Sequence, residues 1–140
     1  MKPCVVDDSV AAAAFFPEPH AQAARRLLAS GAELHAPDLV WAELGNVVWK
    51  RWHRREIDET EAVGLVRDML TLPLTITPGA VLLEAAARLA MRTGRTVYDC
   101  LYLALAVDER TRLVTGDRRL VRALDGTPLE RYVRWIGDLD

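Results

Sequence analysis

The sequence predicts an α/β fold in which a parallel sheet carries helices on both faces. Two observations lead to this prediction: short apolar runs typical of buried strands recur along the chain, and longer stretches with helical spacing of apolar residues separate them. Strands that alternate with helices form parallel sheets, because each connection returns across the sheet. A chain of 140 residues has the size of one domain and can bury about 70% of its unfolded surface. We therefore predict a single domain over residues 1–140.

Five short segments have the pattern of strands. The first four have the clearest pattern and the fifth is weaker, so the predicted sheet has four to five strands. The segments are Cys4–Asp7, Glu33–Ala36, Leu74–Ile76, Leu113–Thr115 and Arg134–Ile136.

Prolines, glycines and capping residues indicate where the helices begin and end. Pro17 and Pro19 end a first helix over SVAAAAFF, and Gly94 closes a later one. Asp38 and Asp58 each precede a helical pattern, so we interpret both as N-terminal caps. A glutamate follows Asp58 three residues on, as in a capping box.

The composition is that of an ordinary globular protein. Hydrophobic residues make up 51% and charged residues 27%, which excludes disordered and collagen-like classes, and the net charge of −2 does not indicate a nucleic-acid-binding protein. Lys2 and Lys50 are the only lysines among 18 basic residues, and the arginines that dominate are suited to bidentate phosphate contacts. Cys4 and Cys100 lie in apolar runs, which favours buried thiols over a disulfide or metal ligands.

The apolar stretches are too short to indicate a membrane span. The first residues also lack the apolar core of a signal peptide, because two aspartates follow almost at once. We therefore expect a cytoplasmic protein.

Acidic residues fall where two of the predicted strands end. Asp7 and Asp8 close the first strand, and Asp117 follows LVTG. Ligands of open parallel sheets bind at the carboxyl ends of the strands, so these acids are candidates for a site. Neighbouring side chains of a strand point to opposite faces, so Asp7 and Asp8 are not expected to share a role. Asp117 has an alternative explanation as the cap of a helix that starts at Arg118.

Asp99 is the most informative of the acidic residues. It is the only charged residue between Arg95 and Asp108, on a helix that is apolar nearly all round and so expected to be buried. A buried carboxylate must be protonated, paired or bound to a cation, because an uncompensated charge costs several kcal/mol. The alternative is a capping box in which Thr96 is the cap and Asp99 its partner.

Glu43 lies on the polar side of a helix predicted from Asp38 to about Arg54. A glutamate in this position is usually only solvated, but Asn46 lies one turn further on, where it is able to orient the carboxylate. The histidines have no metal-ligand spacing, and no Gly-rich phosphate loop or Ser/His/Asp order is present. What remains is an acidic site with oxygen ligands only, which suits Mg²⁺ or Mn²⁺.

Four motifs together resemble those of the PIN-domain ribonucleases, and most closely the VapC-type toxins of bacterial toxin–antitoxin pairs. The motifs are VVDDSV, AELGNVVW, TVYDCLYLALA and LVTGDRRL, and the resemblance extends from residue 4 to about residue 124. It implies a three-layer α/β/α domain with a central parallel sheet of four to five strands. It also implies Mg²⁺- or Mn²⁺-dependent hydrolysis of RNA phosphodiester bonds, a cognate antitoxin and a homodimer.

The resemblance assigns roles to individual residues. The catalytic acids are Asp7, Glu43, Asp99 and Asp117, of which Asp7 and Asp99 are expected to bind the metal; the supporting residues are Ser9, Asn46 and Thr115. One position departs from the family pattern, because Asp8 stands where such proteins usually have a small or hydroxyl residue. We interpret Asp8 as an aid to the start of the following helix, where a negative charge is favoured.

Two clusters of basic residues are candidates for RNA contact. One is the segment WKRWHRRE, where aromatic and basic residues alternate, and the other follows Asp117. The alternative is that the tryptophans pack in a core or a dimer interface and that the arginines form a solvated face. The candidate residues are Lys50, Arg54, Arg55, Arg118 and Arg119.

Two other functions share features with this sequence. A phosphoacceptor receiver domain also has an acidic pair after its first strand, but it needs a late lysine, and its middle strand must end in an acid. This chain has lysine only at positions 2 and 50, and LTITPG ends without an acid. The remaining alternative is a non-catalytic PIN-like module that binds RNA or protein, against which the complete set of four acids argues.

Overall fold

A five-stranded parallel sheet forms the centre of the molecule. The computed structural model describes residues 2–139, and in it every neighbouring pair of strands is parallel. The strand order is β3-β2-β1-β4-β5. The chain thus starts in the middle of the sheet, builds towards one edge and then crosses to the other. The strands are β1 (Cys4–Val6), β2 (Leu34–Pro37), β3 (Leu74–Thr77), β4 (Leu113–Thr115) and β5 (Val133–Trp135).

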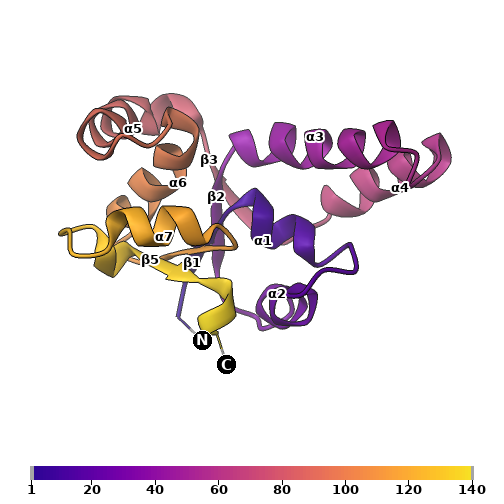
Figure 1. Cartoon of the computed structure of the whole chain (residues 1–140), viewed down its shortest axis with the longest axis horizontal. Coiled ribbons are helices and arrows are strands. Elements are labelled where there is room, and N and C mark those ends of the chain that lie inside the picture. Colours follow the sequence, from indigo (N-terminus) through magenta and orange to yellow (C-terminus); the bar gives the residue numbers. More distant parts are fainter. Residues whose placement is uncertain (1, 140) are drawn as a thin grey trace.

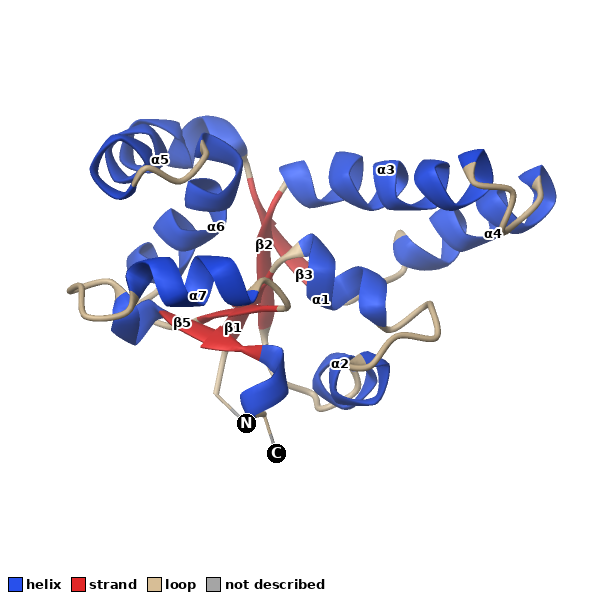
Figure 2. Ribbon diagram, in the orientation of Figure 1, coloured by secondary structure: helices blue, strands red, loops and turns tan. Residues whose placement is uncertain are grey.

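Helices cover both faces of this sheet, as Figures 1 and 2 show. The three-layer α/β/α fold that the sequence predicts is therefore confirmed. Within residues 2–139 the helices are α1 (Asp8–Ala13), α2 (Ala21–Leu28), α3 (Leu39–His53), α4 (Glu59–Met69), α5 (Gly79–Thr93), α6 (Val97–Asp108) and α7 (Arg118–Leu124), with short 3₁₀ helices η1 (Glu130–Tyr132) and η2 (Ile136–Asp138).

The core consists of two hydrophobic clusters, one on each face of the sheet. Val5 and Leu113 belong to the larger cluster with α3, α5 and α6, and Val6 and Val114 belong to the smaller one with α2 and η2. Successive strand residues point to opposite faces, so each short strand supplies both clusters.

The helix α6 is buried almost all round, as its apolar sequence predicts. Every residue from Cys100 to Ala106 is buried, and the helix contacts β1, β2 and β4. Its N-terminus is fixed by Thr96, whose hydroxyl oxygen accepts a hydrogen bond from the Asp99 N–H at 3.1 Å. Both cysteines are buried free thiols, as expected. The rigid core thus determines where Asp99 emerges.

The expected cap is confirmed at Asp58 but not at Asp38, and Asp117 is a cap as its alternative explanation proposed. Asp58 forms the predicted capping box with Glu61, and Asp117 accepts hydrogen bonds from the first turn of α7. Asp38 makes no side-chain cap for α3, because its own backbone is already helical. Its carboxylate instead accepts a hydrogen bond from the Gly79 N–H at 3.0 Å, at the start of α5.

Asp38 reaches Gly79 because β2 and β3 are neighbouring strands of the sheet. Pro37 and Thr77 are paired at the ends of β2 and β3, so the residues that follow these two strands emerge side by side.

The helix α3 points away from the sheet and exposes two of its tryptophans. Val40, Leu44 and Val48 form its buried face, whereas Trp49 is 51% and Trp52 45% exposed. These two tryptophans are therefore not core residues. No helix among residues 2–139 has both the length and the apolar character needed to cross a membrane.

We expect Asp38→Ala to lower the free energy of unfolding by about 1 kcal/mol, the usual cost of losing a helix cap, because the Gly79 N–H then loses its acceptor. Urea denaturation measures this change. Asp38→Asn keeps an acceptor oxygen and should lose less. If both variants are as stable as the wild type, the bond between α3 and α5 contributes nothing.

Candidate active site

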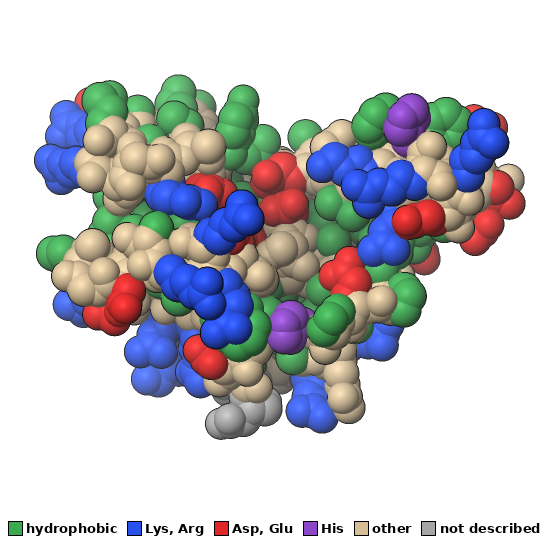
Figure 3. All heavy atoms as spheres, in the orientation of Figure 1, with side chains coloured by type: hydrophobic (Ala, Val, Ile, Leu, Met, Phe, Trp, Pro, Cys, Tyr) green, Lys and Arg blue, Asp and Glu red, His purple; other side chains and the backbone are tan. Residues whose placement is uncertain are grey.

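The carboxyl ends of β1 and β4 meet where the strand order changes direction. In open parallel sheets this switch point is where ligands bind. Asp7 directly follows β1, and Asp117 lies two residues after β4. Figure 3 shows acidic side chains gathered near the middle of this face, with basic side chains on either side.

Asp7 is the most tightly held of the acids and is 8% exposed. Its Oδ1 accepts hydrogen bonds from the Ser9 hydroxyl at 2.5 Å and from the Val10 N–H at 3.2 Å. Its Oδ2 accepts a hydrogen bond from the Thr115 hydroxyl at 2.5 Å. Ser9 and Thr115 are thus placed as the sequence predicts, and they fix both oxygens of the carboxylate.

Ser9 also ties the two central strands together. Its Oγ accepts a hydrogen bond from the Gly116 N–H at 2.8 Å. A Cβ atom at Gly116 would lie 3.1 Å from the Ser9 oxygen, so only glycine allows this approach without a shift. The ends of β1 and β4 therefore have one fixed arrangement.

Burial raises the pKa of Asp7 from its ordinary 3.8 to about 7. The hydrogen bonds from Ser9 and Thr115 oppose this rise, and the negative charge of Asp8 adds to it. In the folded protein the Asp7 carboxyl group is therefore partly protonated near neutral pH.

Glu43 approaches the same edge from α3 and is held by Tyr102 of α6. The Tyr102 hydroxyl donates to Glu43 Oε1 at 2.5 Å. Burial, together with the charges of nearby aspartates, raises the pKa of Glu43 to about 7, and the Tyr102 hydrogen bond opposes this rise. Burial and the Glu43 carboxylate also raise the pKa of Tyr102 well above its ordinary range, so the phenol remains a donor.

Tyr102 takes the role that the sequence predicts for Asn46. Among residues 2–139, the Asn46 side chain makes no hydrogen bond to Glu43, and it is exposed. The prediction that Asn46 orients Glu43 is therefore not supported. A signal for Tyr102 was present in the sequence, since it is a phenol on an otherwise apolar buried helix, one turn after Asp99.

Asp99 and Asp117 share a single cation. Arg95 Nη2 lies 3.6 Å from Asp99 Oδ2 and 3.9 Å from Asp117 Oδ2. Burial raises the pKa of Asp99, Arg95 opposes the rise, and Asp117 adds to it. Asp117 Oδ1 accepts hydrogen bonds from two backbone N–H groups of α7, at 2.9 and 3.3 Å. Asp117 is thus both a helix cap and a neighbour of the other acids.

Asp8 lies in the first turn of α1, where the sequence places it. Its charge also reaches the acid cluster, because it raises the pKa of Glu43 more than Asp7 does. Burial raises the pKa of Asp8 itself, Asp99 adds to the rise, and Lys50 opposes it. The site therefore contains five carboxyl groups that influence one another electrostatically.

The residues proposed for RNA contact lie at different distances from these acids. Lys50 is close enough to lower the pKa of Asp8. Arg54 follows Glu43 by eleven residues, which places it about 16 Å further along the axis of α3. Arg118 packs over the Trp135 ring at 4.1 Å, and Arg119 is exposed beside Asp117.

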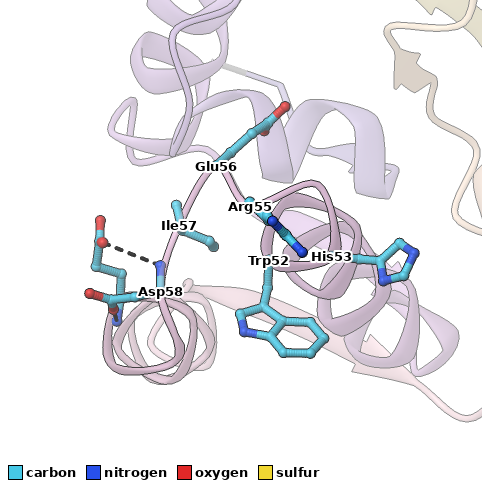
Figure 4. Close-up of a pocket in the computed structure, with 7 residues that line it drawn as sticks. Trp52, His53, Arg55, Glu56, Ile57 and Asp58 are labelled. Atoms are coloured by element: carbon cyan, nitrogen blue, oxygen red, sulfur yellow. Dashed lines mark hydrogen bonds between the residues drawn. The ribbon is translucent and has the colours of Figure 1, made fainter.

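Arg55 lines a separate cavity of about 580 Å³ at the turn between α3 and α4 (Figure 4). Trp52 and His53 line this cavity together with the acids Glu56, Asp58 and Glu61. Its lining therefore has mixed charge and is not a continuous basic path to the site.

The donor chemistry of the acid cluster fits a divalent cation. Its groups offer oxygen atoms only, as Mg²⁺ and Mn²⁺ prefer, and the raised pKa values of Asp7, Glu43 and Asp99 show how strongly burial and mutual repulsion disfavour their charged forms. Within residues 2–139, however, no three His, Cys, Asp or Glu side chains are already arranged to hold a metal ion. Binding of an ion would therefore require side-chain movements in the acid cluster.

The chain belongs to the PIN-domain family. The family model described as PIN domain matches residues 4–125. The chain is 36% identical over 118 residues to Ribonuclease VapC3 of Pyrobaculum aerophilum, which covers 83% of this chain and 90% of that protein.

Solved structures share the fold. The PAE2754 protein of Pyrobaculum aerophilum matches with a TM-score of 0.70 and 23% identity, over 98% of this chain and 85% of the other. A toxin–antitoxin complex from Klebsiella pneumoniae matches with a TM-score of 0.64 and 18% identity, over 94% of this chain and 95% of the other. The resemblance seen in the sequence is thereby confirmed.

We expect the metal-free protein to be less stable at pH 8 than at pH 5. A carboxyl group whose pKa is raised in the folded state binds a proton more tightly there than in the unfolded chain, so stability falls as pH rises from about 4 to about 7. For Asp7 alone the difference between 3.8 and about 7 corresponds to up to about 4 kcal/mol. About 3 kcal/mol of this is lost between pH 5 and pH 8, and urea denaturation in EDTA at these two pH values measures the loss.

The matched variants are Asp7→Asn and Asp58→Asn. Asp7→Asn keeps the shape of the side chain without the charge, so it should be more stable than the wild type at pH 8 and lose much of the pH dependence. Asp58→Asn changes an exposed helix cap, and this variant should keep the pH dependence of the wild type. Equal pH dependence in the wild type and Asp7→Asn would contradict the raised pKa of Asp7.

Proposed function

We propose that this protein is a metal-dependent endoribonuclease of the VapC type, which hydrolyses RNA phosphodiester bonds at Asp7, Glu43, Asp99 and Asp117. The observation that supports it most is the gathering of these carboxyl groups, several with raised pKa values, at the switch point of the sheet. The relative at 36% identity is named a ribonuclease. RNA is the substrate class that follows from both.

Asp7 and Asp99 are the residues that we assign to the ion, Mg²⁺ or Mn²⁺. When bound, such an ion makes a coordinated water more acidic and stabilises negative charge on the phosphoryl oxygens. Asp7 is suited to this role because Ser9 and Thr115 already fix its orientation. The ligand therefore does not have to be ordered when the ion binds.

Glu43 is suited to accept a proton from the attacking water. Tyr102 holds its Oε1 and leaves Oε2 available, and a pKa of about 7 matches proton transfer near neutral pH. Asp117 has Oδ1 engaged at the start of α7, and its Oδ2 is available to hold a water molecule. Attack by water on phosphorus, with cleavage of the P–O3′ bond and protonation of the departing 3′-oxygen, leaves 5′-phosphate and 3′-hydroxyl ends.

A cognate antitoxin is the partner that we propose for this protein. The matched Klebsiella pneumoniae structure is a toxin–antitoxin complex of the same fold. An amphipathic segment laid over the surface near the acids, with a basic side chain reaching them, would block RNA. The cytoplasm, where RNA and such a partner meet, is the compartment that we propose.

We expect the purified wild-type protein to cleave RNA in the presence of Mg²⁺ or Mn²⁺ and to lose this activity in EDTA. Asp7→Asn and Asp99→Asn should each lose at least about 100-fold in rate, because each removes a charged ligand worth several kcal/mol to the transition state. Gel analysis of end-labelled RNA measures the rate and the chemistry of the ends.

Asp58→Asn, purified in the same way, is the control and should cleave like the wild type. Equal cleavage by the wild type and Asp7→Asn would indicate a contaminating nuclease and favour a non-catalytic binding module. Ends with 2′,3′-cyclic phosphate would contradict metal-assisted attack by water.

A homodimer through the outer surface of α5 is the assembly that we propose. Val81 is 72% and Met91 80% exposed on this helix, and Tyr98 at the start of α6 is 63% exposed. Such large apolar side chains in water favour burial against a second copy.

We expect the double variant Val81→Glu with Met91→Glu to be monomeric where the wild type is dimeric, because charges would be buried in the interface. Light scattering after gel filtration measures the mass. Val63→Glu, at a 44% exposed position on α4, is the control and should remain dimeric. A wild-type monomer, or a dimeric double variant, would contradict this interface.

A further inference from the structure

Among residues 2–139, Arg95 is the one cationic side chain within 4.0 Å of an acid of the site. Among the ion pairs of residues 2–139, the only contacts made by an acid of the site are those of Arg95 with Asp99 and Asp117. The arginine stands in the turn between α5 and α6, just before the cap of α6. Its guanidinium therefore lies at the mouth of the site rather than on a remote surface.

These contacts leave the hydrogen-bond donors of Arg95 unused. The distances of 3.6 and 3.9 Å are longer than a hydrogen bond. Its Nε–H is buried and has no acceptor among the described residues, although the side chain as a whole is 27% exposed. Leaving a charged donor without an acceptor is unfavourable, so the guanidinium is suited to bind an anionic group that reaches its exposed part.

The two neighbouring acids are held by helix starts, which limits how far they can turn towards Arg95. Asp117 Oδ1 is engaged by the backbone N–H groups of Arg119 and Leu120. The backbone of Asp99 is fixed by the Thr96 hydroxyl. The guanidinium is therefore positioned by two carboxylates without being satisfied by either.

We propose that Arg95 is a phosphate-binding catalytic residue, whose guanidinium donates hydrogen bonds to the non-bridging oxygens of the RNA phosphodiester that is cleaved. This inference rests on the proposed ribonuclease function. A guanidinium matches two phosphate oxygens in a fork geometry.

A phosphate that approaches five carboxyl groups is repelled, and Arg95 supplies the nearest compensating charge. As the phosphoryl oxygens gain negative charge in the transition state, the same donors stabilise them further. Lys50 acts near Asp8 instead, so the two cations serve different parts of the site.

The test compares Arg95→Gln and Arg95→Lys with the control Arg92→Gln. Arg92 lies in the last turn of α5, three residues earlier, and is exposed. We expect Arg95→Gln to lose about 100-fold in kcat/KM for RNA cleavage, the usual effect of removing one preorganised donor. Arg95→Lys keeps the charge without the fork and should lose about tenfold. Arg92→Gln should cleave like the wild type.

Binding of Mn²⁺, measured by calorimetry, separates phosphate binding from a purely structural role. Arg95→Gln removes a positive charge beside Asp99 and Asp117, so Mn²⁺ should bind as tightly as in the wild type or more tightly. If Mn²⁺ affinity instead falls in parallel with activity, Arg95 acts by holding the acids and the proposal is overturned. Cleavage by Arg95→Gln at the rate of Arg92→Gln overturns it as well.

RNA binding in the Asp7→Asn background tests the same contact without cleavage. Adding Arg95→Gln should weaken binding of single-stranded RNA about tenfold and reduce the slope of log affinity against log salt by about 0.7, the value for one phosphate contact. An unchanged affinity and slope would overturn the phosphate contact. Failure of the proposed function would show separately, as a wild-type protein that binds this RNA and does not cleave it.

Discussion

The structure depends on one buried carboxylate, that of Asp7, at the junction of the two central strands. Ser9 and Thr115 donate to its two oxygens, and Ser9 in turn accepts the Gly116 N–H. This network joins the end of β1 to the end of β4, where a parallel sheet has unpaired groups that need partners. The same bonds that close the fold at this point also orient the acid, so fold and site are inseparable here.

The energetic character of the site follows from placing several acids around this junction. Burial and like charges raise the pKa of Glu43 as they raise that of Asp7, and the single guanidinium of Arg95 offsets only part of the repulsion. Such an arrangement is unfavourable for an isolated domain, and the bound cation that we propose would offset the repulsion. Together with Arg95, the same cation would attract the anionic phosphate.

The exposed apolar surfaces of α3 and α5 lie apart from the acids of the site. The far end of α3 carries exposed tryptophans, and α5 exposes Val81 and Met91. Neither surface is needed to position an acid of the site. Surfaces of this kind are therefore able to bind partners, whether a second copy or an antitoxin, while the core of α6 and the central strands stays unchanged.

The sequence by itself determined the features that depend on local pattern. All five strands, the caps at Asp58 and Asp117, the burial of α6 and the PIN-domain resemblance follow from periodicity, short-range hydrogen bonding and four ordered motifs. Only the tertiary structure decided which side chains meet across elements. Tyr102 reaches Glu43 over 59 residues of sequence, and Asp38 caps α5 over 41 residues. These pairings, and the position of Arg95, depend on how helices pack on the sheet, which residue spacing within one element does not encode.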